Sequence, residues 1–168
     1  YSDFPLVFSG DRFSQSTQDE ESDYILMLSL VREVGLYEMK IDANNAIVHS
    51  QLLRAYDQRL RLNFDDVLEN VGTLISSTGY TECLFEKEIG SKQLFEVYPN
   101  NIFIMPFKHN YNGKISIKNH EIGNIDTQVM GGKIGLIVDT REQKGSLAKE
   151  VKLLNSSMKQ LDVALRGL

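Results

Sequence analysis

Cysteine, tryptophan and proline are scarce in this chain: its 168 residues include one Cys, no Trp and three Pro. The single cysteine, Cys83, cannot form a disulfide within the chain, so the sequence fits a reducing compartment. No apolar run approaches the roughly 18 residues that a membrane-spanning helix needs, and no signal-peptide pattern opens the chain. These absences predict a cytoplasmic protein without a membrane partner.

Basic residues are outnumbered as well. The chain has 18 Lys and Arg against 23 Asp and Glu, which gives a formal net charge of −5. A protein without a basic surplus is poorly suited to neutralise phosphates, so no nucleic-acid partner is expected. Apolar residues make up 42% of the sequence, which is enough for the core of one ordinary domain or two small ones.

Side chains that carry chemistry are few and scattered. His49, His109 and His120 have no Cys, His or acidic neighbour at metal-ligand spacing. Cys83 lies in a run of β-forming residues, which predicts a buried and inert thiol. The sequence has no glycine-rich phosphate loop, no nucleophile elbow and no paired-carboxylate motif. We therefore predict no catalytic residue and no metal site.

Residues 1–62 have the pattern of a strand, a helix and a second strand. The apolar run 4–8 and the alternating run 36–41 flank a helix that begins at the capping box Thr17-x-x-Glu20. Two strands joined by one helix favour a parallel βαβ unit. A second helix from Val48 towards Arg61 carries the one locally basic face, which fits a solvated surface or an anion site.

Residues 63–145 form a β-rich module in this interpretation. A short helix begins at Asn63, and brief apolar runs then alternate with turns rich in Gly and Asn. Regular spacing of this kind is typical of a small sandwich or barrel. The predicted fold class is therefore α+β, with most of the core in the β-rich module.

Residues 146–168 predict an amphipathic C-terminal helix. Ser146 is its N-cap, and Leu154 and Met158 belong to an apolar stripe with spacings of four and three. The stripe suits packing on the same domain, and it is also long enough for the seam of a homo-oligomer.

The most tightly patterned stretch is 131–141. It opens with Gly131 and Gly132 and continues without a polar side chain from Ile134 to Val138, as an interior strand would. Asp139 and Arg141 follow two residues apart, on the same side of an extended chain. We predict a structural corner here; the alternative is a free-standing ligand-binding or enzymatic domain that uses this corner.

This stretch resembles the C-terminal signature of the MutL family that is encoded beside cobalamin-dependent glutamate mutase, which is distinct from the mismatch-repair protein of that name. Other segments match in order: Ser9-Gly10-Asp11 resembles an adenosine-contacting turn, and 68–75 resembles the helix that runs into a Gly-Thr strand. The resemblance implies that 1–62 is a βαβ remnant of an actin-like ATPase domain. The β-rich module and the terminal helix would then follow it.

Functional expectations follow from the resemblance. It implies a non-catalytic interaction portion of a MutL-like protein whose partner is a subunit of an adenosylcobalamin-dependent mutase. Ser9, Gly10 and Asp11 would be a cofactor contact to adenosine, the alternative being an ordinary strand-to-helix turn. Because no phosphate-binding motif is present, we expect no cofactor in this fragment and assign ATP and Mg²⁺ to a longer parent protein.

Overall fold

A computed structural model describes residues 5–10, 13, 20–31, 33–59, 63–87, 90–107 and 112–142. The predicted C-terminal helix, with Leu154 and Met158, lies outside the described residues, and so does Asp11. The described helices are α2 (Glu20–Leu30), α3 (Ala46–Tyr56) and α4 (Phe64–Val67). The described strands are β1 (Leu6–Phe8), β2 (Gly35–Ile41), β3 (Glu69–Ser76), β4 (Thr81–Lys87), β5 (Lys92–Val97), β6 (Ile102–Met105), β7 (Asn112–Asn119), β8 (Gly123–Met130) and β9 (Gly135–Asp139).

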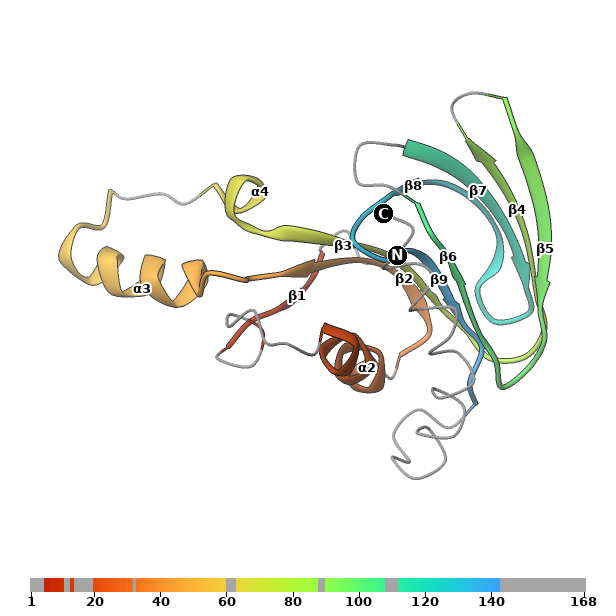
Figure 1. Ribbon diagram of the computed structural model, residues 1–168, viewed down its shortest axis with the longest axis horizontal. Helices are drawn as coiled ribbons and strands as arrows, with labels where there is room; N and C mark the ends of the chain where they lie inside the picture. Colours follow the sequence, from red (N-terminus) through yellow and green to blue (C-terminus); the bar gives the residue numbers. More distant parts are fainter. Residues whose placement is uncertain are drawn as a thin grey trace.

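The strands form two sheets that face each other (Figure 1). Sheet A has the order β1-β2-β3-β9-β6, and sheet B has the order β5-β4-β7-β8. All pairs in sheet B are antiparallel. Sheet A is mixed, with β1 parallel to β2 and β3 parallel to β9. The α+β class and the sandwich-like β module are therefore confirmed.

The predicted βαβ unit is confirmed too, because β1 and β2 pair in parallel on either side of α2 in the chain. The pair does not stand apart from the β module. Strand β2 continues directly into the sheet by pairing with β3, from Gly35 opposite Ser76 to Ile41 opposite Glu69. One sheet therefore joins strands from both segments of the sequence.

Strand β9 is the interior strand that its apolar run predicted. It lies between β3 and β6, and all of its residues are buried. Because side chains alternate along a strand, Ile137 contributes to the core on one face of sheet A, and Leu136 and Val138 contribute to the core between the sheets. Sheet A is thus covered on both faces.

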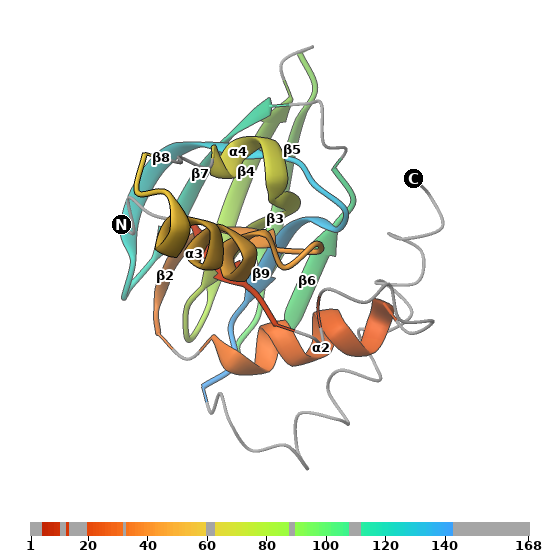
Figure 2. The ribbon, with the colours of Figure 1, turned by 90° about the vertical axis from the view of Figure 1, so that its left-hand side faces the viewer.

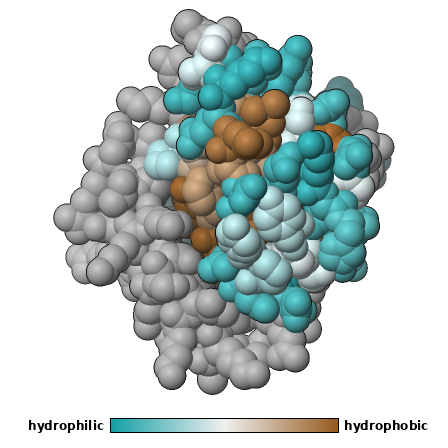
Figure 3. Space-filling model, turned by 90° about the vertical axis from the view of Figure 1, so that its right-hand side faces the viewer, coloured by the Kyte–Doolittle hydropathy of each residue, from teal (hydrophilic) through white to brown (hydrophobic). Residues whose placement is uncertain are grey.

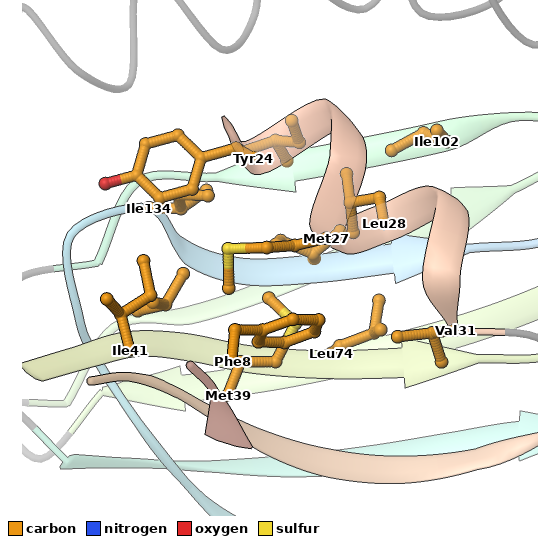
Figure 4. Close-up of a cluster of buried hydrophobic side chains, with 13 residues drawn as sticks. Phe8, Tyr24, Met27, Leu28, Val31, Met39, Ile41, Leu74, Ile102 and Ile134 are labelled. Carbon is orange, nitrogen blue, oxygen red and sulfur yellow. The ribbon is translucent and has the colours of Figure 1, made fainter. Parts of the chain in front are cut away.

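Helix α2 covers the outer face of sheet A. Its buried apolar residues Tyr24, Met27 and Leu28, together with Val31 just after the helix, recur at helical spacing and pack on Met39, Leu74 and Ile137, as Figure 4 shows for most of them. The second core fills the space between the sheets. It consists of Ile75, Cys83, Phe85, Val97, Met105, Phe107, Ile115, Ile117, Val129, Leu136 and Val138.

Helix α3 lies away from both cores. Figure 1 places it at one end of the long axis, with β5 at the other end, and Figure 2 shows it nearest the viewer. None of its residues is buried.

Strand β8 was missed by the sequence reading, which placed a turn at Gly123-Asn124 and no strand between it and the glycine pair. Before Met130, strand β8 has only two large apolar residues, Ile125 and Val129. One face of this edge strand meets solvent, so no apolar run marks the strand in the sequence.

Candidate functional site

Asp139 and Arg141 form a buried ion pair at the end of β9. Arg141 donates from Nε to Asp139 Oδ1 (2.9 Å) and from Nη2 to Asp139 Oδ2 (2.7 Å), while its backbone N–H also donates to Oδ1 (3.0 Å). Their exposed fractions are 1% and 2%. The two-point geometry is the strong form of an arginine–carboxylate pair.

The same guanidinium reaches the helix on the outer face of sheet A. Arg141 Nη2 donates to the carbonyl oxygen of Leu28 in α2, at 3.3 Å. The predicted corner therefore connects the last described strand to α2 across a sequence separation of 113 residues. Both side chains are thus almost completely shielded from solvent.

The glycine pair allows the chain to pass close to β3. A Cβ at Gly132 would lie 2.4 Å from the backbone carbon of Val71 and 2.5 Å from the nitrogen of Gly72. The carbonyl of Gly131 accepts from Asn70 Nδ2 at 2.8 Å, and the N–H of Ile134 donates to the carbonyl of Val71 at 2.9 Å. A glycine at position 132 is therefore required by the close approach of two backbones.

Ser9 and Gly10 lie at the carboxyl end of β1, next to the carboxyl end of β2. The Ser9 hydroxyl donates to Asp42 Oδ2 at 2.9 Å. Asp42 also accepts the backbone N–H groups of Ala46 (2.6 Å) and Ile47 (3.0 Å), and it is fully buried. The carboxylate therefore satisfies donors in the first turn of α3.

The sequence analysis did not predict this capping role of Asp42. The sequence did contain a signal for this role: Asp42 comes just before a helical pattern, and Ser9 ends the strand that pairs with β2 in parallel. Carboxyl ends of parallel strands are where open α/β sheets bind ligands. Here the described polar groups at that edge bind one another, which supports the interpretation of Ser9 and Gly10 as part of an ordinary strand-to-helix turn.

Cys83 lies in the core between the sheets with no exposed surface. Burial, and secondarily the neighbouring charge of Glu82, raises the pKa of the Cys83 thiol to about 12. The predicted burial of this cysteine is confirmed. Within the described residues, no three His, Cys, Asp or Glu side chains are grouped so that they could hold a metal ion. In the same part of the chain, no helix has the length and apolar character to cross a membrane.

An apolar hollow of about 340 Å³ opens beside the edge strand β1. It is lined by Leu6, Phe8, Leu30, Val31, Glu33 and Tyr37. The pKa of Tyr37 is raised, first by partial burial and then by the charge of Glu33. Its hydroxyl donates to the Glu33 carbonyl at 3.3 Å, so this polar group already has a partner within the chain.

Helix α3 exposes large apolar side chains. The exposed fractions are 46% for Val48, 59% for Leu52, 55% for Leu53 and 92% for Tyr56. Positions 48, 52 and 56 recur every four residues and therefore share one face of the helix. An 11-residue helix gains little stability by itself, so a helix with an apolar face usually depends on packing.

The outer face of the β4–β5 hairpin presents four cross-strand pairs, which we call the outer ladder. The register places Glu82 opposite Glu96, Leu84 opposite Leu94 and Glu86 opposite Lys92. One step further along, the rings of Tyr80 and Tyr98 meet edge to face, with centroids 5.7 Å apart. The alternate residues Cys83 and Phe85 point into the core, so the ladder faces solvent.

The outer ladder is acidic and aromatic at one end. Tyr98 donates its hydroxyl to Glu96 at 3.3 Å. A hydrogen bond to Glu96, followed by partial burial and the neighbouring charges, raises the pKa of Tyr80 to about 12. The exposed fractions are 40% for Tyr80, 61% for Tyr98 and 62% for Leu94. Figure 3 views the molecule from this side and shows an apolar patch next to hydrophilic residues.

Comparison with known proteins adds no relative: no family model matches the chain, and neither a curated protein nor a solved structure does.

Proposed function

We propose that this chain is a non-catalytic interaction module of a MutL-like protein and that it binds a subunit of an adenosylcobalamin-dependent mutase. The single observation that carries the interaction role is helix α3, which has no buried residue and exposes Leu52, Leu53 and Tyr56. Burying such side chains against another protein is favourable by roughly 25 cal/mol per Å² of apolar surface. The choice of partner rests on the family resemblance of Gly131, Gly132 and the Asp139/Arg141 corner.

The described polar groups fit a structural role for the candidate residues. Asp139 and Arg141 bind each other, and Ser9 binds Asp42. The alternative, a ligand-binding or enzymatic domain that uses the Asp139/Arg141 corner, has less support because both side chains are at most 2% exposed. We place the module in the cytoplasm, and we assign ATP and Mg²⁺ to a longer parent protein.

Calorimetric titration with each purified subunit of a cobalamin-dependent glutamate mutase tests the interaction role. We expect one subunit to bind, and we expect Leu52→Ser combined with Leu53→Ser to weaken binding at least about tenfold, which corresponds to 1.4 kcal/mol. Leu30→Ser is the matched control, because Leu30 in α2 and Leu53 in α3 are equally exposed (55%) but lie on different elements. Absence of binding tighter than about 1 mM for every subunit would refute the assignment to the mutase.

A second experiment tests the assignment of nucleotide binding to a longer protein. A ligand raises the melting temperature appreciably only when its concentration exceeds its dissociation constant. Because we expect no nucleotide site in this chain, about 1 mM ATP with Mg²⁺ should leave its melting temperature unchanged. A clear increase that disappears in Ser9→Ala would show that Ser9 contacts nucleotide.

A further inference from the structure

The strongest unassigned surface is the outer ladder, and its first unusual property is electrostatic. Glu82 and Glu96 lie directly opposite each other on the solvent face of β4 and β5. Like charges in directly opposed positions destabilise a sheet. Lys118 donates to Glu82 at 2.8 Å. Among the described residues no cation pairs with Glu96, whose described partners are the hydroxyls of Tyr98 and Tyr80.

The second property is the chemistry on either side of the glutamates. On one side the exposed rings of Tyr80 and Tyr98 meet edge to face, and the face of an aromatic ring attracts cations. On the other side Leu84 and Leu94 form an apolar pair. A carboxylate beside tyrosine rings suits an ammonium or guanidinium group, and the leucines suit an apolar side chain next to it.

The third property is the position of β5 at the edge of sheet B among the described strands. Strand β5 is the outermost strand of sheet B, and its described backbone pairing is with β4. An open edge offers unpaired N–H and C=O groups to another extended chain. A segment added there would have the same two-residue side-chain repeat as β5. Its alternate residues would therefore lie beside Leu94, Glu96 and Tyr98.

We propose that the outer ladder binds an extended segment of a partner protein along the edge of β5, with a Lys or Arg on Glu96 and an apolar residue two positions away on Leu94. The third alternate residue of the segment lies beside Tyr98. Main-chain hydrogen bonds to β5 hold the segment, and the side chains determine which segment binds. This surface lies on a different element from α3 and does not depend on the function proposed for that helix.

Two labelled synthetic peptides test the proposal by fluorescence anisotropy. The first peptide contains the sequence Leu-Ser-Arg-Ser-Tyr. The second contains the reverse sequence, so that both directions of the added strand are tested. At least one should bind, and binding should weaken as salt is raised because the contact is between charges. Replacing its arginine with citrulline, which is uncharged and similar in shape, should weaken binding at least about tenfold.

Variants of the full chain locate the site. Glu96→Gln should weaken binding of the arginine peptide at least about tenfold, and Tyr98→Leu should weaken it severalfold. Asp126→Asn is the matched control, since Asp126 is exposed on β8, in the same sheet but at the opposite edge from β5. Glu96→Gln removes a like-charge opposition at a solvent-facing position, so we expect it to fold, and its melting temperature confirms this.

Three results would overturn the proposal. The first is that neither peptide binds the wild-type chain. The second is that the citrulline and arginine peptides bind equally well. The third is that Glu96→Gln and Asp126→Asn have equal effects, which would show a general response to net charge. Weakened binding in Glu96→Gln with unchanged binding in Asp126→Asn and in Leu52→Ser supports the proposal and separates it from the role of α3.

Discussion

The guanidinium of Arg141 lies 2.7 Å from the carboxylate of Asp139 and 3.3 Å from the carbonyl oxygen of Leu28. One buried side chain thus joins the end of β9 to α2. The cost of burying two charges is offset only when geometry and further hydrogen bonds are good. Both conditions hold at this corner, where the carboxylate also accepts the Arg141 backbone N–H.

The first prediction concerns this pair. Arg141→Ala should lower the free energy of unfolding by about 3–5 kcal/mol, because it leaves the Asp139 carboxylate buried without its cation. The double variant Asp139→Asn with Arg141→Ala should lose less unfolding free energy than the sum of the losses in the two single variants, because the two residues are in contact. Denaturant midpoints of the two single variants and the double variant measure this. Strictly additive losses below about 1 kcal/mol would mean that the side chains act independently.

The second prediction concerns the glycine pair. Gly132→Ala should destabilise the protein by about 1–3 kcal/mol, because its Cβ would meet backbone atoms of Val71 and Gly72 within 2.5 Å. Backbone cannot move aside as a side chain can. In Gly35→Ala the Cβ would meet the end of the Tyr37 side chain at 2.9 Å, so this control should change stability by less than about 0.5 kcal/mol. Equal midpoints for the two variants would contradict the close-approach argument.

Local patterns were sufficient for the elements that carry a continuous apolar run or apolar residues at helical spacing. The unbroken apolar run of β9 predicted an interior strand. Of the apolar residues at helical spacing around α2, Met27, Leu28 and Val31 lie in the core, whereas Leu30 is exposed. Strand β8 was missed because an edge strand with one wet face carries few apolar residues. The pairing of β2 with β3 is a non-local contact, and nothing in the spacing of either strand specifies it.

The candidate site shows the same division. The positions of Asp139 and Arg141 on one side of the chain follow from their two-residue spacing, but their contact with Leu28 comes from the packing of α2. The outer ladder was not predicted at all. Its register depends on the hairpin that joins β4 to β5, and only that register brings Glu82 beside Glu96 and Tyr80 beside Tyr98.

The third prediction concerns Asp42. Asp42→Ala removes the acceptor of the Ala46 and Ile47 N–H groups and of the Ser9 hydroxyl, so we expect a loss of about 1–2 kcal/mol in unfolding free energy. Ser9→Ala removes one of these hydrogen bonds and should cost less, about 0.5–1.5 kcal/mol. Chemical denaturation measures both. A greater loss in Ser9→Ala than in Asp42→Ala would show that the serine has a role other than its bond to Asp42.

The fourth prediction concerns the Cys83 thiol. Its pKa near 12 and its complete burial should make it react with an aromatic disulfide at least about 100-fold more slowly in the native protein than after denaturation. Leu94→Cys supplies an exposed thiol on the neighbouring strand as a control, and that thiol should react fast. Two equally fast thiols in this variant would mean that the core between the sheets opens readily.

The last prediction uses the pH dependence of Tyr80. Its hydrogen bond to Glu96 raises the pKa to about 12 in the folded protein, against the ordinary tyrosine pKa of 10.0. The folded state therefore holds this proton more tightly than the unfolded state does. The stabilisation from Tyr80 is complete below pH 10 and is lost as the pH rises from about 10 to about 12.

A difference titration of phenolate absorbance isolates this group, with the Tyr80→Phe curve subtracted from the wild-type curve. We expect the difference to have its midpoint near pH 12 and to move towards 10 in the Glu96→Gln background, because the carboxylate no longer favours the protonated phenol. Asp126→Asn removes a charge from the same sheet without touching the hairpin and should leave the midpoint in place. If Glu96→Gln also left it unchanged, Glu96 would not be the partner of Tyr80.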